Sequence, residues 1–144
     1  MNVTTEMSTR LDPEEITTDS LLGQGSFGVV YKGTFRGNVV AVKRLKQVGE
    51  GNTEACDHDI DTEKEALDEF EREVSMLDKF RCDYIAHFYG AVFIPSKVCM
   101  VTEYAQYGSL NDLMKKRQDD PINMKMRVKI LLDAAVGLEY LHSN

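Results

Sequence analysis

Residues 23–30 read Gly23-Gln24-Gly25-Ser26-Phe27-Gly28-Val29-Val30 and give the strongest indication of the fold. Their glycines have the spacing G-x-G-x-x-G, with a valine two residues further on. Three structures share this spacing: a plain hairpin turn, a dinucleotide-binding turn that opens a helix, and a loop that lies over a nucleotide's phosphates. Because the residues that follow (Val-Val-Tyr-Lys-Gly) are typical of a strand, the dinucleotide structure is excluded. A plain turn and a phosphate loop both remain, since glycine allows close backbone approach and leaves N–H groups free for anionic oxygens.

A second strand follows this loop. Residues 28–43 are predicted to form an antiparallel hairpin, with a Gly- and Asn-containing turn at residues 33–38. Because side chains alternate along a strand, Ala41 and Lys43 share one face. On such a face, a nucleotide base could stack against the small Ala41 side chain while the Lys43 ammonium group reaches a phosphate. The alternative is an ordinary surface lysine, which is what most lysines are.

A helix is predicted over residues 62–80, where the apolar residues recur with spacings of four, four and three (Ala66, Phe70, Val74, Leu77). Glu73 falls inside this apolar stripe. A carboxylate that faces a core costs several kcal/mol unless a cation pairs with it, and Lys43 faces the same interior. Glu69 is the rival acid, but it belongs to an acidic run that we expect to be solvated. The sequence therefore favours a Lys43–Glu73 ion pair.

The formal net charge of −7 is concentrated in one segment. Nine acidic residues and one base lie between residues 50 and 69, so the rest of the chain is nearly neutral. We expect an exposed acidic loop at 47–61. No broad basic face is available for nucleic acid, and no apolar run approaches 18 residues, so we expect neither nucleic-acid binding nor membrane insertion.

The rest of the chain completes an α+β arrangement. We expect a loose leader at 1–14, two further strands within 85–93 and 98–103, a linker at 104–108, and helices at 109–117 and 124–142. The last helix is apolar on several sides, which predicts that it is buried. We therefore expect residues 109–144 to be the incomplete start of a larger helical lobe, and self-association through the uncovered helices is a further expectation.

The cysteines and histidines carry no sign of a metal site. Cys56, Cys82 and Cys99 are few, odd in number and without metal-ligand spacing, which favours reduced thiols in a cytoplasmic protein. The three histidines share no spacing either. We expect no metal ligand within this chain.

Taken together, the glycine loop, the Ala-Val-Lys strand, the helix glutamate and the linker Val101-Thr102-Glu103-Tyr104 resemble the protein kinase family. The resemblance covers residues 21–143 and is greatest to the tyrosine-kinase-like group. It implies a protein-kinase-like fold, in which residues 15–103 form an N-terminal lobe with a five-stranded antiparallel sheet and one mobile helix, and a partial helical C-terminal lobe follows the hinge.

The resemblance also implies roles for particular residues. Lys43 and Glu73 would be the catalytic pair, with Lys43 on the α- and β-phosphates of ATP. The loop over the phosphates would comprise Gly23, Gly25, Ser26 and Gly28. The adenine would be enclosed by Leu22, Val30 and Ala41. The gatekeeper and hinge positions would be Thr102, Glu103, Ala105 and Gly108, with Asp112 at the ribose. Two members of the hydrophobic spine would be Leu77 and Phe88.

The resemblance stops before the family's catalytic loop and metal-binding motif, which are absent from these 144 residues. In phosphoryl transfer those parts hold Mg²⁺ and orient the attacking hydroxyl. The favoured hypothesis is the ATP-binding part of a kinase that phosphorylates Ser, Thr or Tyr hydroxyls of protein substrates, with ATP and Mg²⁺ as cofactors. The alternative is a kinase-like binding module without catalysis.

Overall fold

The computed structural model describes residues 9–25, 28–46 and 57–144, with only the backbone of residues 57–62. The chain divides into two compact units. The first runs to Lys79 and includes Phe88–Tyr104, and the second comprises Phe80–His87 and Ala105–Asn144. The division after Tyr104 lies at the start of the expected hinge. The segment Phe80–His87, which the sequence assigned to the first unit, belongs to the second.

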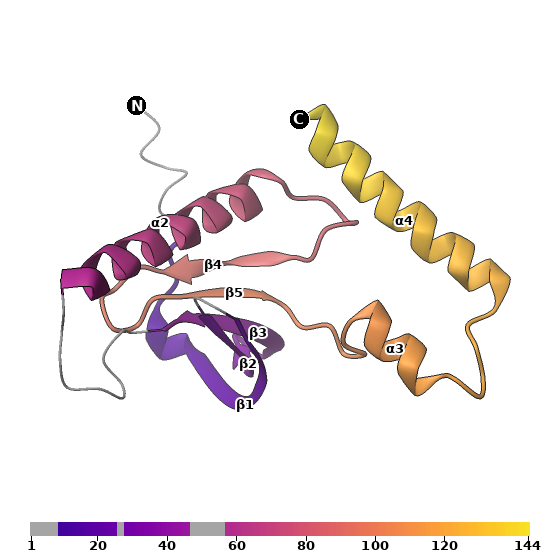
Figure 1. Ribbon diagram of the computed structural model, residues 1–144, viewed down its shortest axis with the longest axis horizontal. Helices are drawn as coiled ribbons and strands as arrows, with labels where there is room; N and C mark the ends of the chain where they lie inside the picture. The colour runs from indigo at the N-terminus through magenta and orange to yellow at the C-terminus, as the bar shows by residue number, and fades with distance from the viewer. Residues whose placement is uncertain (1–8, 26–27, 47–56) are drawn as a thin grey trace. The chain divides into compact units, whose positions relative to one another are not determined.

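The first unit is built on a five-stranded sheet (Figure 1), in the order β1-β2-β3-β5-β4. Every neighbouring pair is antiparallel. The strands are β1 Ile16–Gln24, β2 Gly28–Phe35, β3 Asn38–Leu45, β4 Phe88–Val92 and β5 Cys99–Glu103, preceded by a short 3-10 helix η1 at Pro13–Glu15. The predicted α+β fold with a five-stranded antiparallel sheet is confirmed.

The β2–β3 hairpin closes through Arg36 and Gly37, whose φ angles are 46° and 80°. Two consecutive positive φ values are typical of the tight turn that matches the twist of paired strands. The turn is shorter than the 33–38 predicted, because Gly33 and Thr34 still pair with Val40 and Val39. The predicted hairpin is present, with a longer ladder.

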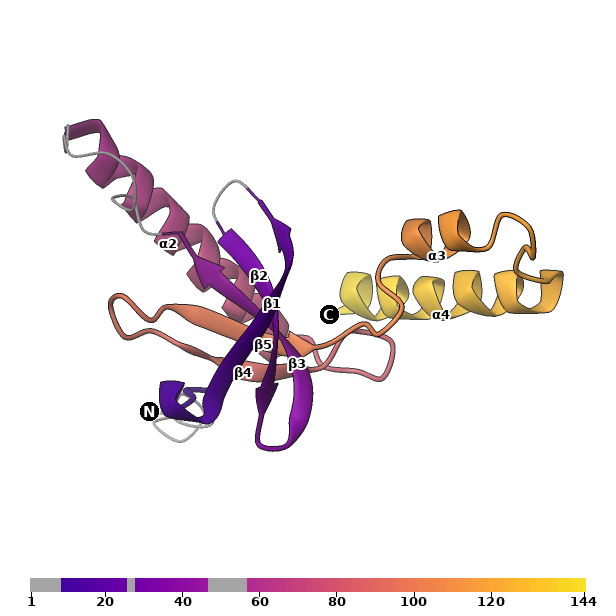
Figure 2. The ribbon, with the colours of Figure 1, turned by 90° about the horizontal axis from the view of Figure 1, so that it is seen from below.

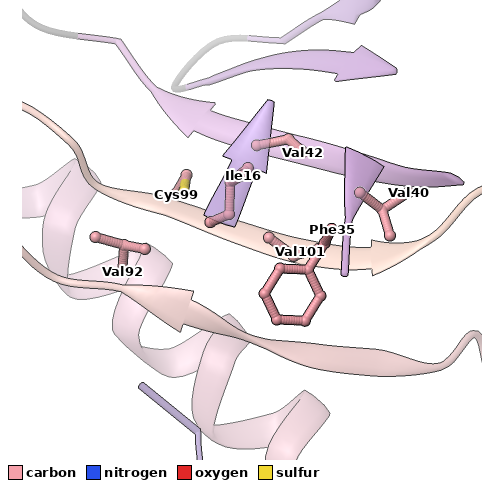
Figure 3. Close-up of a cluster of buried hydrophobic side chains, with 7 residues drawn as sticks. All are labelled: Ile16, Phe35, Val40, Val42, Val92, Cys99 and Val101. Carbon is pink, nitrogen blue, oxygen red and sulfur yellow. The ribbon is translucent and has the colours of Figure 1, made fainter. Parts of the chain in front are cut away.

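One face of the sheet is a dry hydrophobic cluster (Figure 3). Val40 and Val42 of β3 are fully buried here, and Cys99 and Val101 of β5 share the same face. The remaining members of this cluster, called the back cluster below, are Ile16, Phe35 and Val92. Burial raises the pKa of the Cys99 thiol, which keeps it protonated and unreactive.

The other face of the sheet is covered by helix α2, Asp57–Lys79, which lies along it in both ribbon views (Figures 1 and 2). The predicted stripe packs there: Phe70 and Val74 are buried against Phe88, Ala91 and Met100. The helix begins five residues before its predicted start, so the expectation of a loop through residue 61 is wrong from Asp57 onward. An acidic start is compatible with a helix, because negative charge is favoured at a helix N-terminus. Residues 47–56 lie outside the described residues.

The N-terminal segment is tied to the sheet rather than loose. The Leu11 amide donates to the Ala91 carbonyl at 2.9 Å, and the Ala91 amide donates to the Thr9 carbonyl at 2.8 Å. Gly90 makes this possible, because a Cβ at its position would overlap the Thr9 carbonyl oxygen. The expectation of a flexible leader is therefore wrong for residues 9–14, and residues 1–8 lie outside the described part of the chain.

The second unit contains α3, Leu110–Lys116, and α4, Met124–Ser143. Within it, α4 approaches the segment 80–87 at Gly137, where a Cβ would lie 2.9 Å from the Tyr84 carbonyl oxygen. Phe80 packs edge-on against Tyr140, with ring centroids 6.4 Å apart. Among the described helices, none has the length and apolar character that a membrane crossing requires.

Candidate functional site

The predicted ion pair between strand and helix is present. The Lys43 Nζ lies 2.5 Å from the Glu73 Oε2, with the lysine in the middle of β3 and the glutamate on α2. The two side chains are 38% and 41% exposed, so the pair lies at the edge of the helix–sheet contact rather than inside the core. The sequence argument for a buried carboxylate therefore overstated its burial, although it selected the correct partner. Glu69 is exposed and, among the described contacts, forms no ion pair.

A cavity of about 310 Å³ surrounds this pair. Its lining comes from the glycine loop and strands on one side and from α2 on the other: Gly25, Gly28, Val30, Lys43, Arg44 and Leu45, with Ala66, Glu69, Phe70 and Glu73. An ammonium group has three N–H donors, and Glu73 takes one of them. Two donors of Lys43 are thus available for anionic oxygens in the cavity.

The glycine loop reaches this cavity through Gly25 and Gly28. The Gly25 amide donates to the Gly28 carbonyl at 2.8 Å, which closes the loop between β1 and β2. A Cβ at Gly28 would lie 3.0 Å from the Arg44 carbonyl oxygen, so this position has little room for a larger residue. Gly23 has open space around it instead. Ser26, the fourth predicted member of the loop, lies outside the described residues.

The predicted adenine-enclosing residues share the face that carries Lys43. In the ladder, Val30 stands opposite Lys43, and Ala41 stands opposite Thr102 of β5. Ala41, Val30 and Thr102 are all half-buried, and of these three Val30 lines the cavity around Lys43. Leu22 is exposed at the end of β1, and Glu103 ends β5. The strands thus place Val30, Ala41, Lys43 and Thr102 on one face, whereas Glu103 stands opposite Val40 on the back face.

The other three predicted nucleotide contacts, Ala105, Gly108 and Asp112, belong to the second unit. Gly108 has a φ of 74°, a conformation that favours glycine. Asp112 forms a capping box with Ser109 at the start of α3, accepting from both the Ser109 hydroxyl (2.7 Å) and its amide (3.1 Å). These hydrogen bonds lower the pKa of Asp112. The Asp112 carboxylate therefore caps the start of α3, in addition to the ribose contact that the sequence predicts for it.

The two predicted spine residues lie in the core between α2 and the sheet. Phe88 is 1% exposed at the start of β4, and Leu77 packs against the same cluster from α2. They connect the helix that carries Glu73 to the strand beside β5. A change in their packing would therefore move Glu73 relative to Lys43.

Two contacts near the site were missed by sequence reasoning. The Lys46 ammonium donates to the Gly25 carbonyl at 2.9 Å and thereby ties the glycine loop to the end of β3. The Lys32 ammonium lies 5.0 Å from the ring centroid of Tyr104. The strand register could have indicated the second contact, because Lys32 falls on the same face as Ala41 and Lys43. No local pattern marks Lys46.

The described residues contain no group of three His, Cys, Asp or Glu side chains that could hold a metal ion. Lys43 and Glu73 thus meet in a cavity that combines two free ammonium donors, a glycine loop and an apolar strand face. These groups would suit a nucleoside triphosphate whose base packs on the strands and whose phosphates approach the ammonium group.

Comparison with known proteins identifies the family. Residues 16–144 match the family model described as protein tyrosine and serine/threonine kinase. The chain belongs to the protein kinase family. The match begins at β1 and includes all the strands and α-helices described above, while η1 precedes it.

Several relatives are similar over most of this kinase chain. It is 39% identical over 130 residues to the probable serine/threonine-protein kinase SIS8 of Arabidopsis thaliana, a match that covers 90% of this chain and 11% of that protein. It is 35% identical over 139 residues to the dual specificity protein kinase shkB of Dictyostelium discoideum, covering 93% of this chain and 19% of that protein. The chain therefore spans between a tenth and a fifth of the length of these relatives.

Proposed function

We propose that this chain supplies the ATP-binding part of a protein kinase that transfers the γ-phosphoryl group of ATP to hydroxyl groups of protein substrates. The observation that carries the proposal is the 2.5 Å contact between Lys43 of β3 and Glu73 of α2 at the edge of the cavity. This contact unites a strand and a helix that are far apart in the sequence. Its residue types are those with which the kinase family holds ATP phosphates.

Each residue of the site has a distinct task in this proposal. Lys43 uses its two remaining N–H donors to bind oxygens of the α- and β-phosphates. Glu73 accepts the third donor and keeps the ammonium group oriented. The glycine loop lets backbone amides approach the phosphates closely, while Val30 and Ala41 offer an apolar surface to the adenine. ATP, when bound, supplies the phosphoryl group that is transferred.

Magnesium is part of the proposal because protein kinases generally use ATP with Mg²⁺. The residues here do not form a ligand set for it, since no suitable group of three side chains occurs in the described ranges. We therefore assign the ion no ligand among the described residues. Lys43 and Glu73 bind and orient, and the proposal gives them no proton-transfer role.

We propose Ser and Thr hydroxyls as the acceptors. The relatives named above are a probable serine/threonine-protein kinase and a dual specificity protein kinase, which supports this class of acceptor. The glycine loop and hinge resemble the tyrosine-kinase-like group in sequence, and this resemblance does not specify which hydroxyl is phosphorylated. We also propose a cytoplasmic location, supported by the few cysteines, of which Cys82 and Cys99 are free thiols.

Self-association through the second unit is a further part of the proposal. Five apolar side chains of α4 are more than half exposed: Met124, Val128, Leu131, Leu132 and Leu138. Exposed apolar area of this kind favours association. A sedimentation experiment at several concentrations tests it, and a monomer at all concentrations contradicts it.

The substitution Lys43→Met tests the proposed function. In the full-length protein we expect it to abolish phosphorylation of a generic protein substrate, because the phosphates lose their ammonium ligand while the side-chain volume is retained. Glu73→Gln should reduce the rate less, since the amide oxygen can still accept from Lys43. Lys125→Met, at an exposed position of α4, is the matched control and should leave the rate unchanged. Phosphorylation that survives Lys43→Met would overturn the proposal.

A further inference from the structure

A second polar cavity lies on the opposite side of the β2–β3 hairpin from Lys43. Val29 and Arg44 form one pair of the ladder, and their neighbours Val30 and Lys43 form the next, so the two pairs face opposite sides of the sheet. The cavity, called the outer groove below, has a volume of about 500 Å³. Its polar lining consists of Gln24, Tyr31, Arg44, Lys46, Ser96 and Lys97.

The outer groove collects three cations from separate parts of the chain. Arg44 lies on β3, Lys46 follows that strand, and Lys97 lies in the turn between β4 and β5. The described lining contains no carboxylate. This is notable in a chain whose formal net charge is −7. The local charge is thus opposite to that of the molecule, which favours an anionic ligand.

These three cations are only partly occupied by other groups. Among the described residues, no carboxylate pairs with Arg44. Lys46 spends one of its three donors on the Gly25 carbonyl. Lys97 lies 3.1 Å from the Glu14 carboxylate, but both side chains are largely exposed, and exposed ion pairs of this kind are weak and readily exchanged. Most of the cationic donors are therefore available to a ligand.

The backbone and hydroxyl groups of the outer groove point to the same chemistry. Ser96 has a φ of 67°, although it is not glycine. The Lys97 amide donates to the Ile94 carbonyl at 2.9 Å and closes this turn, which holds Ser96 and Lys97 at the groove. Strained positions of this kind are concentrated at ligand clamps and functional turns. Hydroxyls of Ser96 and Tyr31 add donors of the kind that phosphate oxygens accept.

We propose that the outer groove binds a phosphorylated peptide segment of a partner protein. A phosphate monoester carries nearly two negative charges and three acceptor oxygens, which suits an arginine fork flanked by two lysines. The volume of about 500 Å³ exceeds what one phosphate group needs and has room for the residue that carries it. Val29, Leu45 and Val98 supply an apolar wall for the neighbouring peptide side chains. A concave lining favours a peptide over a flat lipid surface.

This proposal concerns other cations than ATP binding does, because Lys43 and Glu73 do not line the outer groove, although Arg44 and Leu45 line both cavities. Its test uses the full chain and a fluorescent peptide with one phosphoserine, measured by anisotropy against the unphosphorylated peptide, inorganic phosphate and phosphatidylserine vesicles. We expect the phosphopeptide to bind at least tenfold more tightly than either of the first two competitors. Equal affinity for the unphosphorylated peptide, equal affinity for inorganic phosphate, or preference for vesicles would each overturn the proposal.

Variants locate the binding in the groove. The double substitution Arg44→Gln and Lys97→Gln should weaken phosphopeptide binding about tenfold or more, because two charge-assisted contacts are lost. Lys125→Gln on α4 removes one positive charge outside the groove and should have no effect. Glu14→Gln should tighten binding about twofold, because it releases Lys97 from its competing carboxylate. Tighter binding by Glu14→Gln could not result from a general loss of folding. Unchanged affinity in both the Arg44/Lys97 double variant and Glu14→Gln would overturn the proposal.

Discussion

The two sides of strand β3 differ in burial and in the kind of contact that they make. Val40 and Val42 are fully buried in the back cluster, whereas Lys43 is 38% exposed and contacts the Glu73 carboxylate. Only one peptide bond separates Val42 from Lys43. Because side chains alternate along a strand, a single segment supplies both a fully buried apolar surface and the open surface that carries Lys43.

The difference indicates that the back cluster and the Lys43–Glu73 contact lie on opposite faces of one strand. The back face excludes water and holds the sheet together through apolar contact. The face toward α2 combines its own apolar cluster with an open edge where Lys43 and Glu73 meet. We therefore expect substitutions on the two faces to separate into effects on unfolding and effects on ATP binding.

Gly33→Ala should have the largest effect on stability. Gly33 lies opposite Val40 on the back face, and a Cβ there would overlap the Thr17 carbonyl oxygen of β1. Because backbone cannot move as a side chain does, we expect a loss of about 3 kcal/mol in the free energy of unfolding, measured with urea. Gly23→Ala is the control, since its Cβ would meet nothing within 4 Å. Equal losses at both glycines would contradict the closed character of the back face.

Val42→Ala should have the next largest effect. The valine is fully buried between β2 and β5, and its removal deletes two methyl groups from the back cluster. We expect a loss of about 2 kcal/mol in unfolding free energy. Val39→Ala on the same strand is the matched control, because Val39 is half exposed and should cost well under 1 kcal/mol. A loss at Val39 as large as that at Val42 would remove the contrast between the two faces.

Much of this contrast could be predicted from the sequence. The period of two in Ala41-Val42-Lys43 predicted which residues share a face, and the stripe at 66, 70, 74 and 77 predicted how the helix packs. The choice of Glu73 over Glu69 followed from that stripe and agrees with the observed contact. These features depend on the local spacing of apolar residues, which can be read directly from a single sequence.

Other features depend on contacts between distant segments and could not be predicted. The start of α2 at Asp57 follows an acidic run without a clear stop or cap signal. The pairing of residues 9–11 with Ala91 uses backbone groups, and Gly90, which makes room for it, does not by itself indicate which segment approaches. The outer groove brings Arg44, Lys46 and Lys97 together only through the sheet topology. Local patterns therefore identified the open face, while the groove behind it required the structure.

Lys43→Met tests the open face, where we expect a substitution to affect ATP binding rather than stability. Its ion pair with Glu73 is more than a third exposed, and such pairs contribute little to stability. We expect the unfolding free energy to change by less than about 1 kcal/mol, while binding of a fluorescent ATP analogue is lost. A loss of stability equal to that of Val42→Ala would mean that Lys43 holds the fold, and the division between the faces would fail.

Lys32→Met should have the smallest effect, and it is the closest match to Lys43→Met. Lys32 lies on the same face of the neighbouring strand, opposite Ala41, and its ammonium is 5.0 Å from the ring centroid of Tyr104. Loss of this cation–π contact should cost about 0.5 kcal/mol in unfolding free energy. Because Lys32 contacts an aromatic ring instead of Glu73, ATP-analogue affinity should change by less than about threefold, which is under 0.7 kcal/mol. If Lys32→Met abolished binding as Lys43→Met does, positive charge anywhere on this face would suffice, and the specific role of the Lys43–Glu73 pair would be refuted.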